Sequence, residues 1–215
     1  MRVSQVSRHF KENGCYATVI DIYERIAARI RGRILYGRLR AKNLRLGPRA
    51  VIRGICCIEI GEGFWAGEGL WLEALTRYNT QQFSPKIRIG RNVCFSQRVH
   101  IAATNYVEIG DDVLFGSKVI ITDHNHGYYS EQHTSPMIAP GKRPLDFDRR
   151  VVIGSKVWLC DGVVVTPGSE VGEGAVVGAN SVVCGVISPF TVSAGVPAKV
   201  IKRFDFNQQR WVGAQ

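Results

Sequence analysis

Residues 153–183 read IGSKVWLCDGVVVTPGSEVGEGAVVGANSVV, and an aliphatic side chain recurs in this stretch at every sixth position. The six positions are Ile153, Leu159, Val165, Val171, Val177 and Val183. Glycine often follows the aliphatic residue, and the fifth residue of each unit is small or aliphatic. A helix face recurs every 3.6 residues and a half-buried strand alternates every two, so a period of six fits neither. The period is typical of a parallel β-helix built from hexapeptide units.

The same period covers most of the chain that precedes this stretch. It recurs, with interruptions, at Leu46, Ile52, Ile60, Ala66, Leu72, Ile89, Phe95, Ile101, Ile109, Phe115 and Ile121. Three units make a triangular coil of about 18 residues, so these positions predict roughly six coils. We expect the repeated aliphatic side chain to point inward and glycine to supply unusual backbone angles at the turns. A mainly β solenoid over residues 46–203 is therefore predicted, in preference to a β-sandwich.

Composition and length indicate an ordinary globular chain. Its 215 residues are 45% hydrophobic and 21% charged, which is typical of soluble domains. No apolar run reaches the ~18 residues that a spanning helix needs, and the first residues lack the apolar core of a secretory signal. We therefore expect a cytoplasmic protein, in which the six scattered cysteines are reduced thiols and a zinc cluster of thiolates has little support.

The net charge of +10 is concentrated near the N-terminus. Seven basic residues occur after Glu24 with no acidic residue among them: Arg25, Arg29, Arg31, Arg33, Arg38, Arg40 and Lys42. Apolar residues recur there at helical spacing, at Val19, Ile22, Tyr23, Ile26, Ile30 and Ile34. We predict a basic helical extension over residues 1–45. Two interpretations stay open: a cap over the N-terminal end of the solenoid, and a surface helix that contacts anionic lipid through residues 19–42. Nucleic-acid binding is not expected, because no aromatic platform accompanies the charge.

Segments that interrupt the repeat are candidates for functional loops. Residues 73–86 form a polar insertion, and residues 127–150 contain three prolines and no hexad. A loop this long in a compact domain is commonly a lid or a binding loop. It begins directly after Asp123-His124-Asn125-His126. Residues 204–215 are expected to form a polar tail that is helical over 205–211.

The segment TDHNHG at 122–127, the hexads of 153–183 and the closing SAGVPAKVIKR at 193–203 resemble hexapeptide-repeat acyltransferases. The resemblance is closest to the O-acetyltransferases of polysaccharide and lipopolysaccharide synthesis and to galactoside and maltose acetyltransferases. It implies a left-handed parallel β-helix, a homotrimer, and an active site in the cleft between two neighbouring subunits. It also implies acetyl-CoA as the acyl donor and no metal.

The resemblance assigns roles to individual residues. His124 falls on the family's catalytic histidine and Trp158 on the tryptophan of its active site. Residues expected beside the cofactor are Cys160, Ala179, Ser181, Cys184, Pro197, Lys199 and Lys202, with the lysines at its phosphates and the proline near its adenine. The chain has Cys184-Gly185 where many relatives carry Thr-Lys, so the phosphates depend more on the lysines and Arg203. The family's acceptor-side asparagine maps near Ser96 or Gln97, which puts a simple galactoside acceptor in doubt.

The chemistry of acetyl transfer explains why a histidine is needed. A sugar hydroxyl is a weak nucleophile, and a histidine, with a pKa of about 6.5, is a suitable general base. Asp123 or a backbone carbonyl is expected to hold the other ring nitrogen, and a backbone N–H to stabilise the oxyanion. His126 is the alternative base or an acceptor contact. Trp158, too large for the interior of a coil, and Tyr128 are expected to face the substrates. Direct transfer needs no covalent intermediate, so neither Cys160 nor Cys184 is expected to be a nucleophile.

The sequence thus predicts an acetyl-CoA-dependent O-acetyltransferase that modifies a sugar hydroxyl in cell-surface polysaccharide or nucleotide-sugar metabolism. The acceptor is expected to be a sugar, a nucleotide-sugar or a lipid-linked saccharide at the inner face of the membrane. Two alternatives stay open. One is a γ-class carbonic anhydrase-like enzyme with zinc on His100, His124 and His126; the other is a β-helix scaffold without catalytic activity.

Overall fold

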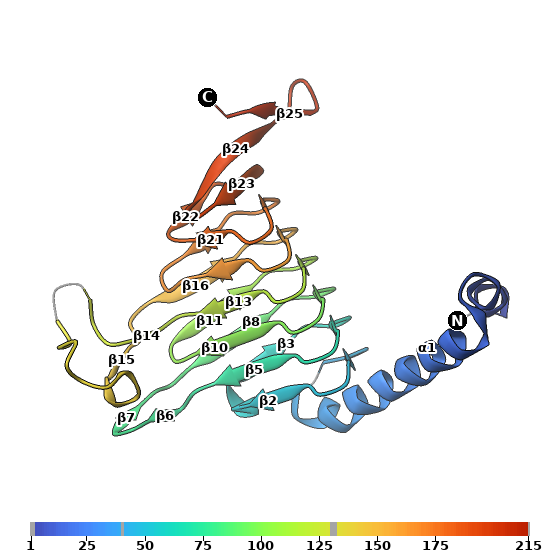
Figure 1. The fold of residues 1–215 in the computed structure, drawn as a ribbon, viewed down its shortest axis with the longest axis horizontal. Coiled ribbons are helices and arrows are strands. Elements are labelled where there is room, and N and C mark those ends of the chain that lie inside the picture. Colours follow the sequence, from blue (N-terminus) through green and yellow to red (C-terminus); the bar gives the residue numbers. More distant parts are fainter. Residues whose placement is uncertain (1–2, 40, 130–132, 215) are drawn as a thin grey trace.

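A computed structural model of the protein describes residues 3–39, 41–129 and 133–214. The chain is a parallel β-helix whose coils stack along one axis, with a helix leaving one end and a strand hairpin closing the other (Figure 1). Arg40 and the side chain of Arg38, both counted in the basic segment, lie outside the described residues.

Three sheets form the sides of the solenoid. Sheet A contains β1 (Arg45–Leu46), β4 (Trp65–Ala66), β9 (Cys94–Phe95), β12 (Leu114–Phe115), β17 (Trp158–Leu159), β20 (Val176–Val177), β23 (Thr191–Gly195), β24 (Ala198–Asp205) and β25 (Arg210–Gly213). Sheet B contains β2 (Val51–Arg53), β5 (Trp71–Ala74), β10 (His100–Ala103), β13 (Ile120–Thr122), β18 (Val164–Val165) and β21 (Val182–Val183). Sheet C contains β3 (Ile58–Ile60), β8 (Lys86–Ile89), β11 (Tyr106–Ile109), β16 (Arg150–Ile153), β19 (Glu170–Val171) and β22 (Val186–Ile187).

The chain passes from sheet A to B to C and back to A, so neighbours within a sheet come from successive coils. Six strands in sheet B and six in sheet C, counted over the described residues, confirm the expected number of coils. The parallel pairing confirms the predicted fold class.

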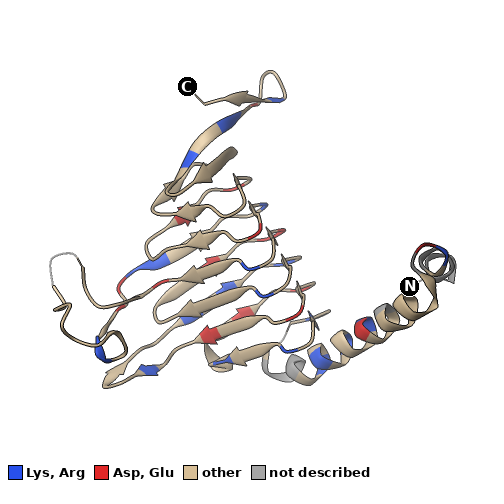
Figure 2. Ribbon diagram, in the orientation of Figure 1, with Lys and Arg blue, Asp and Glu red and all other residues tan. Residues whose placement is uncertain are grey.

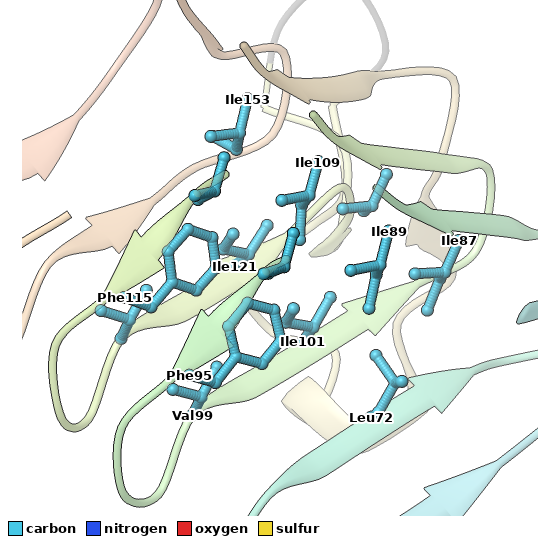
Figure 3. Close-up of a cluster of buried hydrophobic side chains, with 14 of the residues drawn as sticks. Leu72, Ile87, Ile89, Phe95, Val99, Ile101, Ile109, Phe115, Ile121 and Ile153 are labelled. Atoms are coloured by element: carbon cyan, nitrogen blue, oxygen red, sulfur yellow. The ribbon is translucent and has the colours of Figure 1, made fainter. Parts of the chain in front are cut away.

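The repeated aliphatic residues of the hexads form the core. Strand register places Ile101 on Ile121 and Ile109 on Ile153, all of them buried (Figure 3). The rings of Phe95 and Phe115 stack with their centroids 4.5 Å apart and their planes 7° from parallel. These contacts from coil to coil make the core a continuous column. Burial of each such side chain contributes about 1.5–3 kcal/mol to the stability of the fold.

The expected role of the glycine after each aliphatic residue is wrong. Gly90 does not have a positive φ; instead, a Cβ there would lie 2.6 Å from the backbone carbonyl of Gly110 in the next coil. Glycine is needed at this place because the coils approach closely. The left-handed backbone falls two residues later, at Asn92 (φ 56°) and Asp112 (φ 58°), residue types that tolerate it.

The N-terminal helix α1 (Val3–Leu39) bends at Gly14 and projects sideways from the first coil (Figure 1). Its C-terminal half joins the solenoid through buried Ala28 and Leu39 and through Arg31, whose Nε donates to the Leu46 carbonyl at 2.7 Å. The apolar residues that the spacing singled out point elsewhere: Val19, Tyr23, Ile26, Ile30 and Ile34 are all exposed. A cap formed by these side chains over their own solenoid is therefore wrong. No helix in the described part of the chain is long and apolar enough to span a bilayer.

Two insertions and the C-terminus complete the fold. The first insertion is a hairpin of β6 (Arg77–Tyr78) and β7 (Gln81–Gln82), and the first coil contains the short helix η1 (Ile55–Cys57). The long loop contains η2 (Pro140–Lys142) and a ladder of β14 (Asn125–His126) with β15 (Leu145–Asp146). The helix expected over 205–211 is wrong, because β24 and β25 pair there as an antiparallel hairpin.

Candidate active site

A buried carboxylate lies where β13 ends and the chain leaves the solenoid for the long loop. Asp123 is fully buried and accepts hydrogen bonds from the backbone amides of Thr104 (2.9 Å), Asn105 (2.8 Å) and Tyr106 (2.9 Å). The Thr104 hydroxyl adds a fourth donor at 3.1 Å. These donors come from the corner between β10 and β11, one coil earlier. Hydrogen bonds to an ionised acceptor are the stronger kind, so the corner fixes the carboxylate in one orientation.

His124 is oriented by this carboxylate. Its Nδ1 lies 2.9 Å from Asp123 Oδ1 and 3.3 Å from the Thr122 hydroxyl, and its side chain is 11% exposed. Because the carboxylate only accepts, the proton of a neutral His124 belongs on Nδ1. No partner for Nε2 is found among the described residues. The expected contact between Asp123 and His124 is therefore present, and it leaves Nε2 able to accept a proton.

His126 has a different environment. It pairs with Leu145 across the β14–β15 ladder, and its Nδ1 lies 3.2 Å from the Tyr78 hydroxyl. Tyr78 donates to the Gly141 carbonyl at 2.8 Å, and Gln81 exchanges two hydrogen bonds with the Leu145 backbone, at 2.7 and 3.0 Å. The hairpin of the first insertion thus binds both ends of the long loop through hydrogen bonds, and His126 takes part in one of them. Sequence reasoning missed Tyr78 and Gln81, for which the polar character of residues 73–86 was the available signal.

Tyr128 lies in the same loop and is half-buried. Burial raises the pKa of its hydroxyl, and the nearby Asp146 and Asp148 raise it further. The phenol therefore stays neutral and able to donate a hydrogen bond. Tyr128, at the start of the long loop, therefore stays a candidate for contact with the acceptor substrate.

The outer face of sheet B carries a polar and aromatic column below His124. Trp71 is the register partner of His100 on the next strand, and their ring centroids are 5.1 Å apart. Glu73 accepts from Trp71 Nε1 at 2.9 Å and pairs with Arg53 at 3.3 Å. Burial lowers the pKa of His100; Glu73 opposes the shift and His124 adds to it. The sequence pattern predicted His100 only as a possible zinc ligand. The described residues contain no group of three His, Cys, Asp or Glu arranged to hold a metal.

Trp158 and Ser96 lie on other sides of the solenoid. Trp158 is on the outer face of sheet A, 46% exposed, between Leu114 and Val176. Ser96 follows β9 at the corner between sheets A and B, whereas His124 lies at the corner between B and C. Val157 is the inward fifth residue of its unit, and Trp158, the next residue, points outward, so the expectation that it lies outside the coil interior is confirmed. One chain therefore does not bring Trp158 or Ser96 to His124.

The residues expected beside the cofactor are mostly accessible, with one exception. Cys160 is half-buried, and the other accessible members of the set are exposed: Ala179, Cys184, Pro197, Lys199 and Lys202. Ser181 is buried, and its hydroxyl accepts from the Gly195 amide at 3.0 Å. A side-chain contact of Ser181 with a cofactor is therefore wrong, because the fifth position of a unit points inward.

The accessible residues divide between two sides of the solenoid. Lys199 and Lys202 lie on β24, two strands beyond β20 and in the same sheet as Trp158, whereas Cys184 follows β21 of sheet B. His124 therefore lies on one side of the solenoid, whereas Trp158, Lys199 and Lys202 lie on another.

Comparisons with known proteins agree with this architecture. A profile of the family "Bacterial transferase hexapeptide (six repeats)" matches residues 150–185. WbbJ of Escherichia coli K12, named as a candidate lipopolysaccharide biosynthesis O-acetyl transferase, is 46% identical over 162 residues, covering 74% of this chain and 79% of WbbJ. The galactoside O-acetyltransferase of the same organism is 30% identical over 139 residues, 65% of this chain and 63% of that protein.

Solved structures share the fold at low sequence identity. A mutant of AntD, an N-acyltransferase from Bacillus cereus in complex with dTDP and coenzyme A, has a TM-score of 0.59 at 18% identity and covers 78% of this chain and 84% of its own. A hexapeptide-repeat acetyltransferase of Vibrio cholerae complexed with acetyl coenzyme A has a TM-score of 0.53 at 21% identity and covers 82% and 78%. With the fold shared and WbbJ similar over most of both chains, the chain belongs to the hexapeptide-repeat acetyltransferase family.

Proposed function

We propose that the protein transfers the acetyl group of acetyl-CoA directly to a sugar hydroxyl, with His124 as general base. The observation that carries this proposal is the Asp123–His124 pair, in which a fully buried carboxylate with four other donors contacts Nδ1 at 2.9 Å. The pair combines a fixed tautomer with a ring nitrogen left for a substrate.

The reaction needs one proton to move twice. The acceptor oxygen attacks the thioester carbonyl while His124 Nε2 takes the hydroxyl proton. The tetrahedral intermediate collapses with cleavage of the C–S bond, and the imidazolium returns the proton to the CoA thiolate. The products are the acetyl ester and free CoA. Asp123 stabilises the imidazolium that exists between the two transfers.

We propose that the working site is shared between subunits of a homotrimer. What supports this is the separation, within one chain, of His124 from Trp158, Lys199 and Lys202. A second subunit that presents its sheet A side to the His124 corner would complete the cleft. Three chains of 23.9 kDa give a particle of about 72 kDa, which light scattering measures directly.

The proposed acceptor is a saccharide of cell-surface polysaccharide synthesis, carried on a nucleotide or on a lipid. Support comes from the names of the relatives: a lipopolysaccharide O-acetyl transferase, a galactoside O-acetyltransferase and, for the fold, an N-acyltransferase crystallised with dTDP. A cytoplasmic enzyme at the inner membrane face would meet either acceptor. Contact of residues 19–42 with that face is supported by the exposed apolar residues of α1 and by Arg29 and Arg33 beside them.

Titration calorimetry with CoA and acetyl-CoA tests the class of reaction. Micromolar binding, followed by acceptor-dependent release of CoA with a panel of sugars and nucleotide-sugars, is the expected result. Absence of binding by the folded protein would refute acetyl transfer and return attention to the scaffold alternative.

A further inference from the structure

A hollow of about 340 Å³ lies where α1 joins the first coil. Three arginines line it: Arg29 and Arg33 from α1, and Arg45 from β1. Asn43 and the backbone around Gly32 and Leu44 complete the wall. Figure 2 shows basic residues on the part of α1 that approaches the solenoid.

The walls of the hollow are held together by close packing. Gly32 of the helix approaches the Leu44 carbonyl so closely that any side chain at Gly32 would overlap it. Ala28 and Leu39 are buried on the same side of α1, and Arg31 donates to the Leu46 carbonyl at 2.7 Å. The helix therefore cannot move away from β1 without loss of these contacts, and the three arginines stay grouped.

The positive charge in the hollow is uncompensated. No ion pair or side-chain hydrogen bond is found for Arg29, Arg33 or Arg45 within the described residues. None of the described residues that line the hollow is acidic. Several arginines of the solenoid have a carboxylate partner, as Arg91 has Asp111 at 2.6 Å, whereas the hollow groups three arginines for which the described residues offer none. Arg29 and Arg33 lie one turn apart on the helix, a spacing at which like charges destabilise each other. An anion in the hollow would remove that repulsion.

We infer that this hollow is a binding site for a phosphate group. Guanidinium groups bind phosphate oxygens through paired, charge-assisted hydrogen bonds, and three of them are enough to neutralise a phosphate monoester, which carries about −1.5 to −2 at pH 7. The site is separate from the proposed cofactor phosphates. Arg45 lies on β1 and Lys199 on β24, seven strand steps apart in sheet A, or about 34 Å at 4.8 Å per step.

The phosphate has two possible sources, and they are separable. The apolar residues Tyr23, Ile26 and Ile30 are exposed on the same helix, so a lipid headgroup could enter the hollow while its tails meet the helix. A soluble diphosphate, such as the one in a nucleotide-sugar, offers the same chemistry without the tails. The proposal that the phosphate belongs to a lipid depends on the membrane contact proposed above for residues 19–42. The proposal of a phosphate site does not depend on that contact.

The test compares three proteins that differ only in surface charge. The first is the unaltered chain. The second carries Arg29→Gln, Arg33→Gln and Arg45→Gln. The matched control carries Arg98→Gln, Arg150→Gln and Arg210→Gln, three exposed arginines outside the hollow, and loses the same charge.

Each protein is titrated with inorganic pyrophosphate by calorimetry and mixed with phosphatidylglycerol or phosphatidylcholine vesicles for co-flotation. We expect the unaltered chain and the control to bind at least one anionic probe, and the hollow variant to bind it at least about tenfold more weakly. Flotation with phosphatidylglycerol that the hollow variant loses and the control keeps identifies a lipid headgroup. Pyrophosphate binding without flotation identifies a soluble phosphate.

Equal binding by the hollow variant and the control, or no binding of either probe by the unaltered chain, would overturn the inference. If the triple variant melts early, the single variants Arg33→Gln and Arg45→Gln replace it, each with an expected loss of about threefold or more. Acetyl-CoA titration of the same proteins reports separately on the proposed function, because its phosphate residues lie at the other end of the solenoid.

Discussion

Replacement of Asp123 by Asn tests how the carboxylate sets the tautomer of His124. Asp123 Oδ2 accepts from the amides of Asn105 (2.8 Å) and Tyr106 (2.9 Å), whereas Oδ1 faces His124 Nδ1 at 2.9 Å. The Thr104 amide also reaches Oδ2, at 3.1 Å, so the single oxygen of Asn placed at the Oδ2 position can accept from three backbone amides that cannot turn away. Its NH₂ group then points at Nδ1, which must give up its proton in order to accept. The proton moves to Nε2, where it blocks the base.

The magnitude follows from this geometry. With the base in the wrong tautomer, we expect kcat to fall by about 10²–10⁴-fold, the contribution usual for a general base. The NH₂ group also meets the Thr104 amide, which bonds Oδ1 at 2.9 Å and Oδ2 at 3.1 Å and would keep only the longer of the two bonds. Two donors facing each other in a buried site cost about 1–3 kcal/mol, so a drop of that size in unfolding free energy is expected.

The assay is the initial rate of CoA release, with acetyl-CoA affinity and urea unfolding measured on the same protein. Asp112→Asn is the matched control, because Asp112 lies on a turn and accepts from Asn92 at 3.0 Å away from the site. A kcat within about threefold of the unaltered enzyme, in a folded Asp123→Asn protein, would refute the assignment of Asp123 as the group that orients the base.

Three further predictions concern the column, the core and the loop. Because burial lowers the pKa of His100 below its usual 6.5, the unfolded chain binds more protons between the lowered pKa and 6.5. The contribution of neutral His100 to the free energy of unfolding is therefore fully present above pH 6.5 and is lost as the pH falls through that window. His100→Gln should flatten the rise of the urea unfolding midpoint with pH, measured between about pH 5 and 8. An unchanged slope would count against this role of His100. Phe95 packs between Phe64 and Phe115, so Phe95→Ala should lower unfolding free energy by about 3–5 kcal/mol, and a loss below about 1 kcal/mol would contradict the stacked core. Tyr78→Phe removes the hydroxyl bonded to Gly141 and beside His126; acceptor KM should rise by roughly two- to tenfold with kcat little changed, and a large fall in kcat alone would show that Tyr78 has a chemical role.

The fold was predictable because its core repeats a local pattern. Each inward residue, such as Ile153 or Val177, is identified by its distance from the one before it, without knowledge of any distant contact. The direction of α1 was not predictable. Its apolar stripe and its contact face both repeat at helical spacing, and only packing of Ala28 and Leu39 against the first coil decides which face meets the solenoid.

The site was predictable only where its parts are adjacent in sequence. Asp123 and His124 are neighbours, so their contact could be expected from the sequence alone. Tyr78 reaches Gly141, 63 residues away, and a contact at that separation leaves no local signal. Ser181 was assigned to the cofactor from the family resemblance, whereas the coil turns the fifth residue of the unit inward, where the Ser181 hydroxyl accepts from the Gly195 amide.

The most direct test of His124 as the general base is the acetyl transfer rate of His124→Ala, measured as acceptor-dependent CoA release beside the unaltered enzyme. Because Ala keeps the backbone and removes only the ring held by Asp123, oligomeric mass and acetyl-CoA affinity should stay unchanged. We expect a fall in kcat of about 10²–10⁴-fold. A His124→Ala protein that turns over at the unaltered rate would contradict the assignment of His124 as the base.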